Sequence, residues 1–397
     1  MRLGSPCIPI GLAWSSPFVR WQGSLADVNS LDLAASVTRD ALARGGVEPA
    51  AITRLVLGWT VPQRESFYGA PTLAARLGAT DVSGAMLSQA CATGVACLEA
   101  AAATVALEPG AVVLAVTTDR TSNGPVLIHP GGSRPGGTPD VERWVLDSFE
   151  RDPWGGTSMV ATAEAVAAEG GMTKDELDDL TLVRYQQYRD ALADDRAFQR
   201  TWMVPVTIPR RRGPALIVDA DEGVHETTPE ALAKLAPVAP GGVVSFGSQT
   251  HPADGAAGMI VASEDRAREL SGGAGVARIL ATGFARVEQG RMPKAPVPAA
   301  RQALADADLA IDAVHVIKTH NPFAVNDLWF AREMGVNAGA MNPYGSSLVY
   351  GHPQAPTGAR GIAELIEVLR RRGGGTGLFT GCAAGDTGAA VILRVED

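Results

Sequence analysis

The sequence predicts an α/β protein made of two related halves with a mostly helical insertion between them. Apolar runs of strand length alternate with segments whose apolar residues recur at helical spacing. The order strand, reactive residue, helix, strand occurs around Cys91 and again around the pair His352 and Cys382. Residues 120–245 lack this alternation and include a Gly- and Pro-rich stretch. These observations predict two βαβαβ-type halves in an α/β/α/β/α layering.

A chain of 397 residues is too long for one small core, so more than one domain is expected. The domain boundaries are placed where the pattern of strands and helices changes. Residues 1–119 are assigned to an N-terminal half, which about residues 246–275 complete. Residues 120–245 form a loop domain, which we expect to lie over the active face. Residues 276–397 form the C-terminal half.

Composition and charge exclude several classes of function. A hydrophobic content of 46% with 19% charged residues is typical of a compact folded chain. The net charge is −9, and the two basic runs, Arg210–Arg212 and Arg370–Arg372, are short, so we expect no nucleic-acid partner. The longest apolar stretch, at residues 100–116, is interrupted by Glu108 and Pro109, so no membrane span is expected.

The cysteines indicate a reducing environment. Four are present, and none forms a C-x-x-C pair, which argues against a zinc site and against a disulfide framework. Pro6 and Pro9 interrupt any signal-like helix near the start. We therefore expect a cytoplasmic protein with reduced thiols available for chemistry. Cys7 and Cys97 are interpreted as small buried apolar residues.

In the N-terminal half, strands and helices follow one another closely. A helix is predicted over residues 30–44, with Ser30 as its N-cap and two glycines after it. Buried strands are expected at 55–61 and 111–116, and a short helix at 71–77. A strand-like run stops at Cys91, from which an alanine-rich helix continues to Leu107.

The insertion reads as a surface loop at residues 130–139 followed by mostly helical segments. Helices are predicted at 162–168, 174–180 and 182–192, a strand at 204–208, and a short helix from Thr228 to about Lys234.

The strand pattern resumes at 242–246 and 256–262, and the segment 277–284 is expected to pair with it. A helix at 298–307 precedes a strand at 315–320. His352 opens a helix whose apolar residues extend to 372. A short strand at 377–380 follows, with Cys382 on the turn after it. Parallel strands joined by a crossover helix would bring His352 and Cys382 to the same carboxyl edge.

Four motifs mark strand ends or helix starts. They are Gln89–Gly94 around Cys91, His320–Ala324, Gly351–Pro353 around His352, and Gly381–Gly385 around Cys382. In this order and spacing they resemble the thiolase family, with weaker similarity along nearly the whole chain. The His at position 320 resembles the sterol-carrier-protein-type subgroup, which uses two histidines. The resemblance implies the thiolase fold.

The resemblance also implies a role for each motif. Cys91 would be the nucleophile that becomes acylated, His352 the base that takes its proton, and Cys382 the acid and base at the second carbon. His320 with a water would form one oxyanion hole, and the backbone N–H groups of Cys91 and Ala384 the other. A structural strand-end histidine is the competing interpretation of His320.

Contacts to the acyl-pantetheine part of CoA are implied for Met159, Thr250 and Phe323, and contact near its adenine for Arg211. Apolar packing competes as the interpretation of Met159 and Phe323, and a solvated charge run as that of Arg211. No metal site and no permanently bound cofactor are expected, since the remaining histidines lack metal-ligand spacing. CoA itself enters as a substrate.

Three segments depart from the family pattern. Pro322 stands in the loop that would touch the pantetheine, and Ala384 replaces a glycine whose N–H alone is needed. His251 also replaces a glycine, next to Thr250, which keeps a hydroxyl for CoA.

The sequence therefore predicts thiolytic cleavage of 3-ketoacyl-CoA, or the reverse Claisen condensation, through an acyl-cysteine. Acyl-CoA and CoA are the expected partners, and the assembly is expected to be a homodimer or homotetramer. Two rivals remain. A ketoacyl-synthase-like enzyme would lack the second cysteine, so Cys382 speaks against it. A non-catalytic acyl-CoA or lipid carrier, or a chain acting with a partner subunit, would fit the altered CoA-facing segments.

Overall fold

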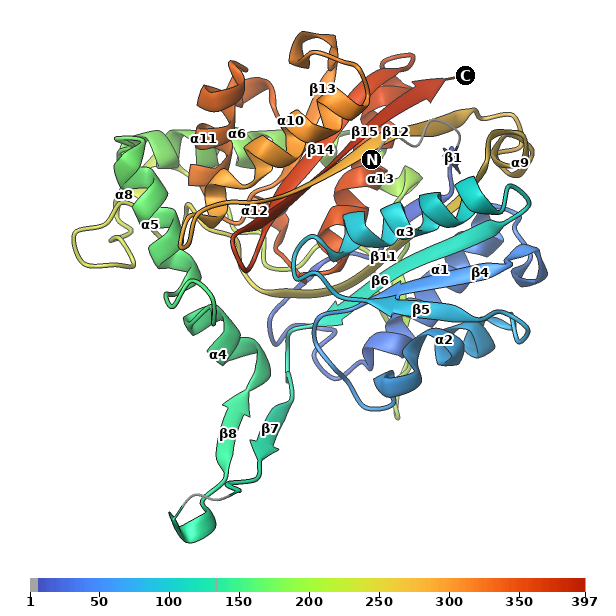
Figure 1. The fold of residues 1–397 in the computed structure, drawn as a ribbon, viewed down its shortest axis with the longest axis horizontal. Helices are drawn as coiled ribbons and strands as arrows, with labels where there is room; N and C mark the ends of the chain where they lie inside the picture. Colours follow the sequence, from blue (N-terminus) through green and yellow to red (C-terminus); the bar gives the residue numbers. More distant parts are fainter. Residues whose placement is uncertain (1–5, 133–134, 397) are drawn as a thin grey trace.

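Two helices lie between the two halves of a long mixed sheet, as Figure 1 shows for the computed structural model, which describes residues 6–132 and 135–396. The central helices are α3 (Thr93–Leu107) and α13 (Pro356–Arg371), which pack on each other and on strands of both halves. Helices α1 (Ser30–Arg44) and α2 (Gly69–Leu77) cover the outer face of the N-terminal half. Helices α10 (Pro296–Asp306) and α11 (Ala324–Met334) lie on the outer side of the C-terminal half. The predicted α/β/α/β/α thiolase-like layering is confirmed.

The N-terminal half of the sheet has the strand order β11-β6-β4-β5. Its strands are β11 (Ala253–Ser263), β6 (Val112–Arg120), β4 (Arg54–Gly58) and β5 (Gly84–Leu87). Strand β4 pairs in parallel with both β5 and β6, whereas β11 pairs antiparallel with β6. Parallel pairing makes β4 buried on both faces, which explains why its sequence is a continuous apolar run.

The C-terminal half has the order β13-β14-β15-β12. Its strands are β13 (Val316–His320), β14 (Gly375–Ala383), β15 (Thr387–Glu396) and β12 (Val276–Arg286). Strands β13 and β14 are parallel, so both run toward the same edge. His320 is the last residue of β13 and pairs with Gly381 of β14. The pairing therefore sets His320 one residue away from the level of Cys382 in the sheet.

Strand β1 (Pro6–Pro9) joins the two halves into one sheet, because it pairs antiparallel with both β11 and β12. The prediction that residues 277–284 pair with 256–262 is therefore wrong, since β1 occupies the hydrogen-bonding edge that each of them would have offered the other. Strands β2 (Ala13–Ser15) and β3 (Val19–Arg20) also pair with β11.

The insertion begins with a hairpin that projects from the body of the protein in Figure 1. Its strands are β7 (Val126–His129) and β8 (Asp140–Arg143). The predicted loop 130–139 forms the tip, although residues 133–134 lie outside the described part of the chain. The elements that follow are α4 (Trp144–Glu150), α5 (Met159–Glu169), α6 (Lys174–Ala191), α7 (Ala193–Arg196), β9 (Val206–Ile208), β10 (Leu216–Val218) and α8 (Pro229–Ala233).

Local predictions differ from the structure at the ends and joints of elements. Asn29 rather than Ser30 caps α1, because its side chain accepts from the N–H of Leu31. The two helices predicted at 174–180 and 182–192 are the single helix α6, which begins in a capping box between Thr173 and Glu176.

Residues 242–246, which were predicted to form a strand, do not form one in the structure. The carboxylate of Glu164 accepts hydrogen bonds from the N–H groups of Val243 and Val244, so these donors are not available to a neighbouring strand. Further on, β14 extends to Ala383, and Cys382 lies inside the strand rather than on the turn after it.

Within the described residues, the stretch Ala90–Leu107 has the length and apolar composition of a membrane-crossing helix. Half of this stretch is buried inside the molecule, and α3 contacts β6, β4 and α13. It therefore packs as a core helix.

Candidate active site

Cys91 lies in the turn between β5 and α3, and the backbone of this turn is strained. The preceding residue, Ala90, has a φ of 44°, in the left-handed region that residues with a Cβ rarely adopt. The Thr93 hydroxyl stabilises the turn, since it donates to the Ala90 carbonyl at 2.7 Å and accepts from the Gln89 N–H at 2.8 Å. The turn thereby presents Cys91 at the start of α3.

A glycine lets the two central helices meet at this point. A Cβ on Gly94 would lie 2.6 Å from the backbone nitrogen of Ala359 in α13, which is closer than real atoms approach. The glycine in the first motif is therefore required by close packing of α3 on α13. Because the segment leading into α13 carries His352 and Gln354, this packing brings them to Cys91.

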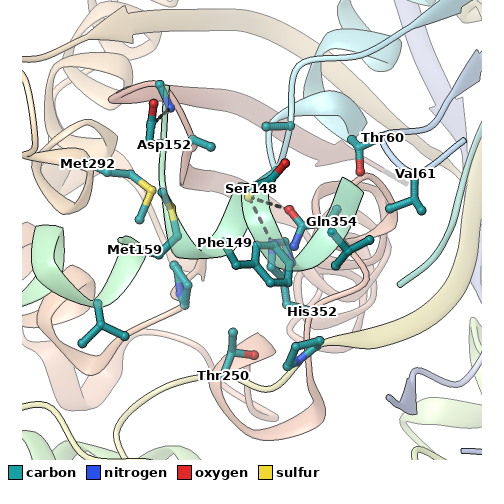
Figure 2. A pocket seen from close by; sticks show the side chains of 18 of the residues that line it. Thr60, Val61, Ser148, Phe149, Asp152, Met159, Thr250, Met292, His352 and Gln354 are labelled. Atoms are coloured by element: carbon teal, nitrogen blue, oxygen red, sulfur yellow. Dashed lines mark hydrogen bonds between the residues drawn. The ribbon is translucent and has the colours of Figure 1, made fainter. Parts of the chain in front are cut away.

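The sulfur of Cys91 contacts two side chains from that segment. His352 Nε2 lies 3.1 Å from the sulfur, and the Gln354 side-chain oxygen accepts from it at 3.2 Å. Figure 2 shows Gln354 and His352 side by side on the wall of the cavity. Gln354 has a φ of 68°, so its backbone is also held in the left-handed region.

Further contacts fix the orientation of His352. Its Nδ1 lies 2.6 Å from the hydroxyl of Thr357, the second residue of α13, so Nε2 faces Cys91. Its backbone is held against residues 251–253, which lead into β11, because His352 N donates to His251 O and His352 O accepts from Ala253 N. His352 precedes α13 by four residues, so it does not open the helix as predicted.

His320 lies directly beside His352, with 4.0 Å between the ring centroids. Its Nδ1 is 2.9 Å from the Ser347 hydroxyl, whereas its Nε2 has no hydrogen-bond partner although the residue is only 2% exposed. An unpartnered buried nitrogen is costly in a structural side chain. It is therefore available to a substrate atom or a ligand.

Cys382 approaches the same point from β14 and is only 1% exposed. The Asn326 side-chain amide, in the first turn of α11, donates to its sulfur at 3.2 Å. The two sulfurs are close enough that the negative charge of one thiolate raises the pKa of the other. The structure thus brings together all four predicted side chains, Cys91, His320, His352 and Cys382.

Burial keeps the resting site uncharged. Removal from water lowers the pKa of His320 to about 3 and that of His352 well below its usual value, so both imidazoles are neutral at pH 7. Burial likewise raises the pKa of the Cys91 thiol to about 12, although hydrogen bonds from the backbone N–H groups of Ala384 and of Cys91 itself lower it. Burial also raises the pKa of Cys382 well above its usual value. Cys91 is therefore a thiol beside a neutral proton acceptor.

The buried carboxylate of Asp119 connects two walls of the site. Asp119 accepts from the N–H groups of Thr60 and Val61, from the Thr60 hydroxyl, and from the N–H of Ala355, all within 2.9 Å. Burial raises the pKa of Asp119 to about 7 against these hydrogen bonds. Asp119 thereby holds the loop after β4 against the residue that follows Gln354.

A largely apolar cavity of about 630 Å³ leads to Cys91. Phe149 from α4 and Met159 from α5 stand in it with Met292, as Figure 2 shows. Other lining residues include Trp144, Trp154, Thr250, Pro322, Phe323, His352, Gln354 and Ala384. Two helices of the 120–245 insertion thus form part of the cavity wall.

Of the four residues predicted to contact CoA, three line the cavity and one does not. Met159, Thr250 and Phe323 line the cavity, whereas Arg211 is exposed on the connection between β9 and β10 and is not part of the lining. The Thr250 hydroxyl already donates to the Ser347 carbonyl, so its proton is used inside the protein.

The two atypical segments of the sequence pair with each other. Thr250 N donates to Pro322 O at 2.7 Å, and Ala324 N donates to Ser248 O at 2.9 Å. The departures at 247–251 and 320–324 therefore form one joined wall of the cavity.

Two further residues of the site were not predicted from the sequence. Gln354 is hydrogen-bonded to the sulfur of Cys91, and Asn326 to that of Cys382. Gln354 could have been noticed from its position two residues after His352, because it sits in the same motif. Asn326 carries no comparable signal, since only the fold brings it to Cys382.

A thiol at hydrogen-bond distance from a neutral imidazole, at the end of an apolar cavity, defines an enzyme with a cysteine nucleophile. Family models described as "Thiolase, N-terminal domain" and "Thiolase, C-terminal domain" match residues 10–265 and 274–395. The chain belongs to the thiolase family.

Similar proteins of known name support the assignment to the thiolase family. An acetyl-CoA acetyltransferase of Chromobacterium violaceum is 30% identical, with 94% of this chain and 95% of that protein covered. A beta-ketoadipyl-CoA thiolase of Pseudomonas aeruginosa is 31% identical, with 96% of each covered.

Solved structures agree as well. The acetyl-CoA acetyltransferase of Bacillus anthracis superposes with a TM-score of 0.91 at 27% identity, over 100% of both chains. Human mitochondrial 3-ketoacyl-CoA thiolase in complex with CoA superposes with a TM-score of 0.89 at 26% identity, over 100% of this chain and 99% of that one.

Proposed function

We propose that this protein is a thiolase-type acyltransferase that cleaves 3-ketoacyl-CoA with CoA, and that runs the reverse Claisen condensation, through an acyl-Cys91 intermediate. The observation that supports this most strongly is the 3.1 Å contact between Cys91 Sγ and His352 Nε2, with the Cys382 sulfur close by. Neither a carrier nor a ketoacyl-synthase-like enzyme requires this second thiol.

In the first half-reaction, His352 takes the Cys91 proton as the sulfur attacks the ketone carbon of the substrate. The bond between C2 and C3 then breaks, which leaves the acyl group on Cys91 and an acetyl-CoA enolate. Cys382 gives its proton to the enolate carbon, and acetyl-CoA leaves. Asn326 supports this step, because its amide can donate to the thiolate that Cys382 becomes.

In the second half-reaction, the thiolate that Cys382 became takes the proton of the CoA thiol, and the CoA sulfur attacks the acyl-Cys91 carbonyl. Acyl-CoA leaves, and the Cys91 sulfur recovers a proton from His352. Both half-reactions pass through oxyanions. The N–H groups of Cys91 and Ala384, which point at the sulfur, are in place for one of them, and His320 Nε2 for the other.

Incubation with a 3-ketoacyl-CoA followed by intact-mass measurement tests the proposal. An adduct with the mass of the acyl group should appear and should vanish when CoA is added. Tight binding of the substrate with no adduct would contradict the enzyme and favour a carrier.

We further propose a homodimer that forms through the β5 edge. Strand β5 ends the sheet order, three of its four residues are exposed, and the neighbouring Phe67 and Tyr68 are 79% and 69% exposed. Sedimentation should report a dimer for the native chain and a monomer for Met86→Lys. A Met86→Lys chain that remains dimeric would contradict this edge. For the dimer we infer a cytoplasmic location, in keeping with a reduced Cys91.

A further inference from the structure

Three side chains around the reacting sulfur have the arrangement of a metal-binding site. The ligand atoms of Cys91, His320 and His352 all lie within 4.8 Å of one another. A tetrahedral zinc ion has Zn–S bonds of about 2.3 Å and Zn–N bonds of about 2.0 Å, which sets its ligand atoms about 3.3 to 3.6 Å apart. The 3.1 Å separation of Cys91 Sγ and His352 Nε2 is slightly shorter than this, whereas the 4.8 Å that bounds the group is longer. Side-chain rotations that open the first pair and bring His320 closer would therefore admit the ion.

Hydrogen bonds at Nδ1 orient both imidazole rings for metal binding. Thr357 engages Nδ1 of His352, and Ser347 engages Nδ1 of His320, so both Nε2 atoms face the sulfur. The Ser347 hydroxyl can donate to Asn321 Oδ1, 3.3 Å away, while it accepts from His320 Nδ1–H. In that tautomer Nε2 of His320 carries a lone pair for the metal, whereas the other tautomer, with the proton on Nε2, serves the oxyanion. A hydrogen bond on the second ring nitrogen is the usual support of metal-ligating histidines, and here hydroxyl groups provide it.

An independent observation points to a ligand at this position. His320 Nε2 has no partner in the described structure, although the residue is 2% exposed. The apolar cavity reaches Cys91 and His352, so an ion can enter and keep an open coordination position toward the cavity. Three protein ligands with one open position is the pattern of accessible zinc sites.

We propose that Cys91, His320 and His352 bind a soft divalent cation, zinc or cadmium, and that this ion reversibly silences the enzyme. On binding, the Cys91 S–H bond breaks, its proton passes to the solvent, and the sulfur forms a bond to the metal. The same ion occupies the lone pair of His352 that would accept the thiol proton. Binding rests on the geometry alone, and only the silencing rests on the proposed function.

Titration of the purified full chain with cadmium tests binding without reference to turnover. One equivalent should produce the ultraviolet charge-transfer band of a cadmium–thiolate bond. Cys91→Ala should abolish this band, and His320→Asn should weaken binding at least about 10-fold. The matched controls Cys97→Ala, a buried thiol in the core, and His225→Asn, an exposed histidine, should bind as the native chain does.

Protection provides a second measurement on the native chain, in case His320→Asn does not fold. Zinc at one equivalent should slow alkylation of Cys91 by iodoacetamide, and a chelator should restore the rate. A band that survives in Cys91→Ala, or that is lost in His225→Asn, would mean an adventitious ion only and would overturn the proposal. If cadmium binds but turnover does not change, the metal site stands and the proposal that the metal inhibits the enzyme is wrong. Binding in a chain that forms no acyl adduct would overturn the proposed function alone.

Discussion

The two cysteines of the site differ in almost every feature of their surroundings. Cys91 lies in a strained turn at a helix start, lines the cavity, and contacts the side chains of His352 and Gln354. Cys382 lies inside β14, is 1% exposed, and has one side-chain donor, Asn326. A nucleophile needs access to the substrate and a base, whereas a proton donor needs burial and a partner for its anion. The surroundings therefore assign acyl transfer to Cys91 and proton transfer to Cys382.

Removal of the nucleophile should have the largest effect. Cys91→Ala should lower kcat by about 10⁴-fold or more, because no covalent intermediate can form. The measurement is steady-state thiolysis of a 3-ketoacyl-CoA, with Cys97→Ala as the control for loss of a thiol. Turnover near that of the control would contradict the role of Cys91.

Cys382→Ser should separate the two steps. Carbon–carbon cleavage should fall about 10² to 10⁴-fold, because a hydroxyl is a poor proton donor and acceptor here. Acyl transfer from a simple thioester onto Cys91 should remain measurable, since that step needs no carbon acid. The two rates are compared by thiolysis assays and by intact mass. Equal loss of both would refute this division between the cysteines.

The partner of the second sulfur should affect the same step less. Asn326→Leu removes the one side-chain hydrogen bond that Cys382 makes within the described residues, which would stabilise its thiolate by about 1.5 to 3 kcal/mol. Carbon–carbon cleavage should therefore slow about 10 to 100-fold. Rates of acylation by a simple thioester serve as the control and should stay near the native value. If Asn326→Leu slowed acylation but not carbon–carbon cleavage, Asn326 would act on the Cys91 step rather than on the Cys382 step.

Gln354→Leu tests the partner of the first sulfur. A hydrogen bond between neutral groups contributes about 0.5 to 1.5 kcal/mol, so acylation by thioesters and by 3-ketoacyl-CoA should both change about 3 to 10-fold. Stopped-flow acylation measures both. If only carbon–carbon cleavage responded, Gln354 would belong functionally with Cys382 rather than with Cys91.

The smallest effect is on stability and concerns His320. Burial lowers its folded pKa to about 3, while the unfolded value is 6.5. Between these values the unfolded chain binds more protons, so folding stability falls as pH decreases, by up to about 1.4 kcal/mol per pH unit for one group. Denaturant unfolding at pH 7 and pH 5 should show this loss in the native chain and less of it in His320→Asn. An unchanged slope in the variant would mean that His320 titrates normally.

Much of this architecture could be predicted from the sequence because its signals are local. Apolar runs identified β4, β6 and β11, and helical spacing with a glycine ending identified α1. The motifs around Cys91, His320, His352 and Cys382 brought out the residues that the structure places together. Each of these signals depends on a few neighbouring residues.

What could not be predicted depends on contacts between distant segments. Strand β1 lies between β11 and β12, and Glu164 takes the N–H groups of a predicted strand at 242–246. Asp119, Gln354 and Asn326 have ordinary local sequences, and their importance comes from the sulfur or loop that the fold brings to them. Arg211 shows the opposite case, since a motif position did not bring its side chain into the cavity lining.

The most direct test is the location of the acyl group at the level of peptides. Cys382→Ser is incubated with a thioester donor, digested, and mapped by tandem mass spectrometry, with the native chain in parallel. We expect the acyl group on the peptide that contains Cys91 in both proteins, and its removal by added CoA. Acylation of the Cys382 peptide in the native chain, with none on Cys91, would contradict the assignment of the two sulfurs.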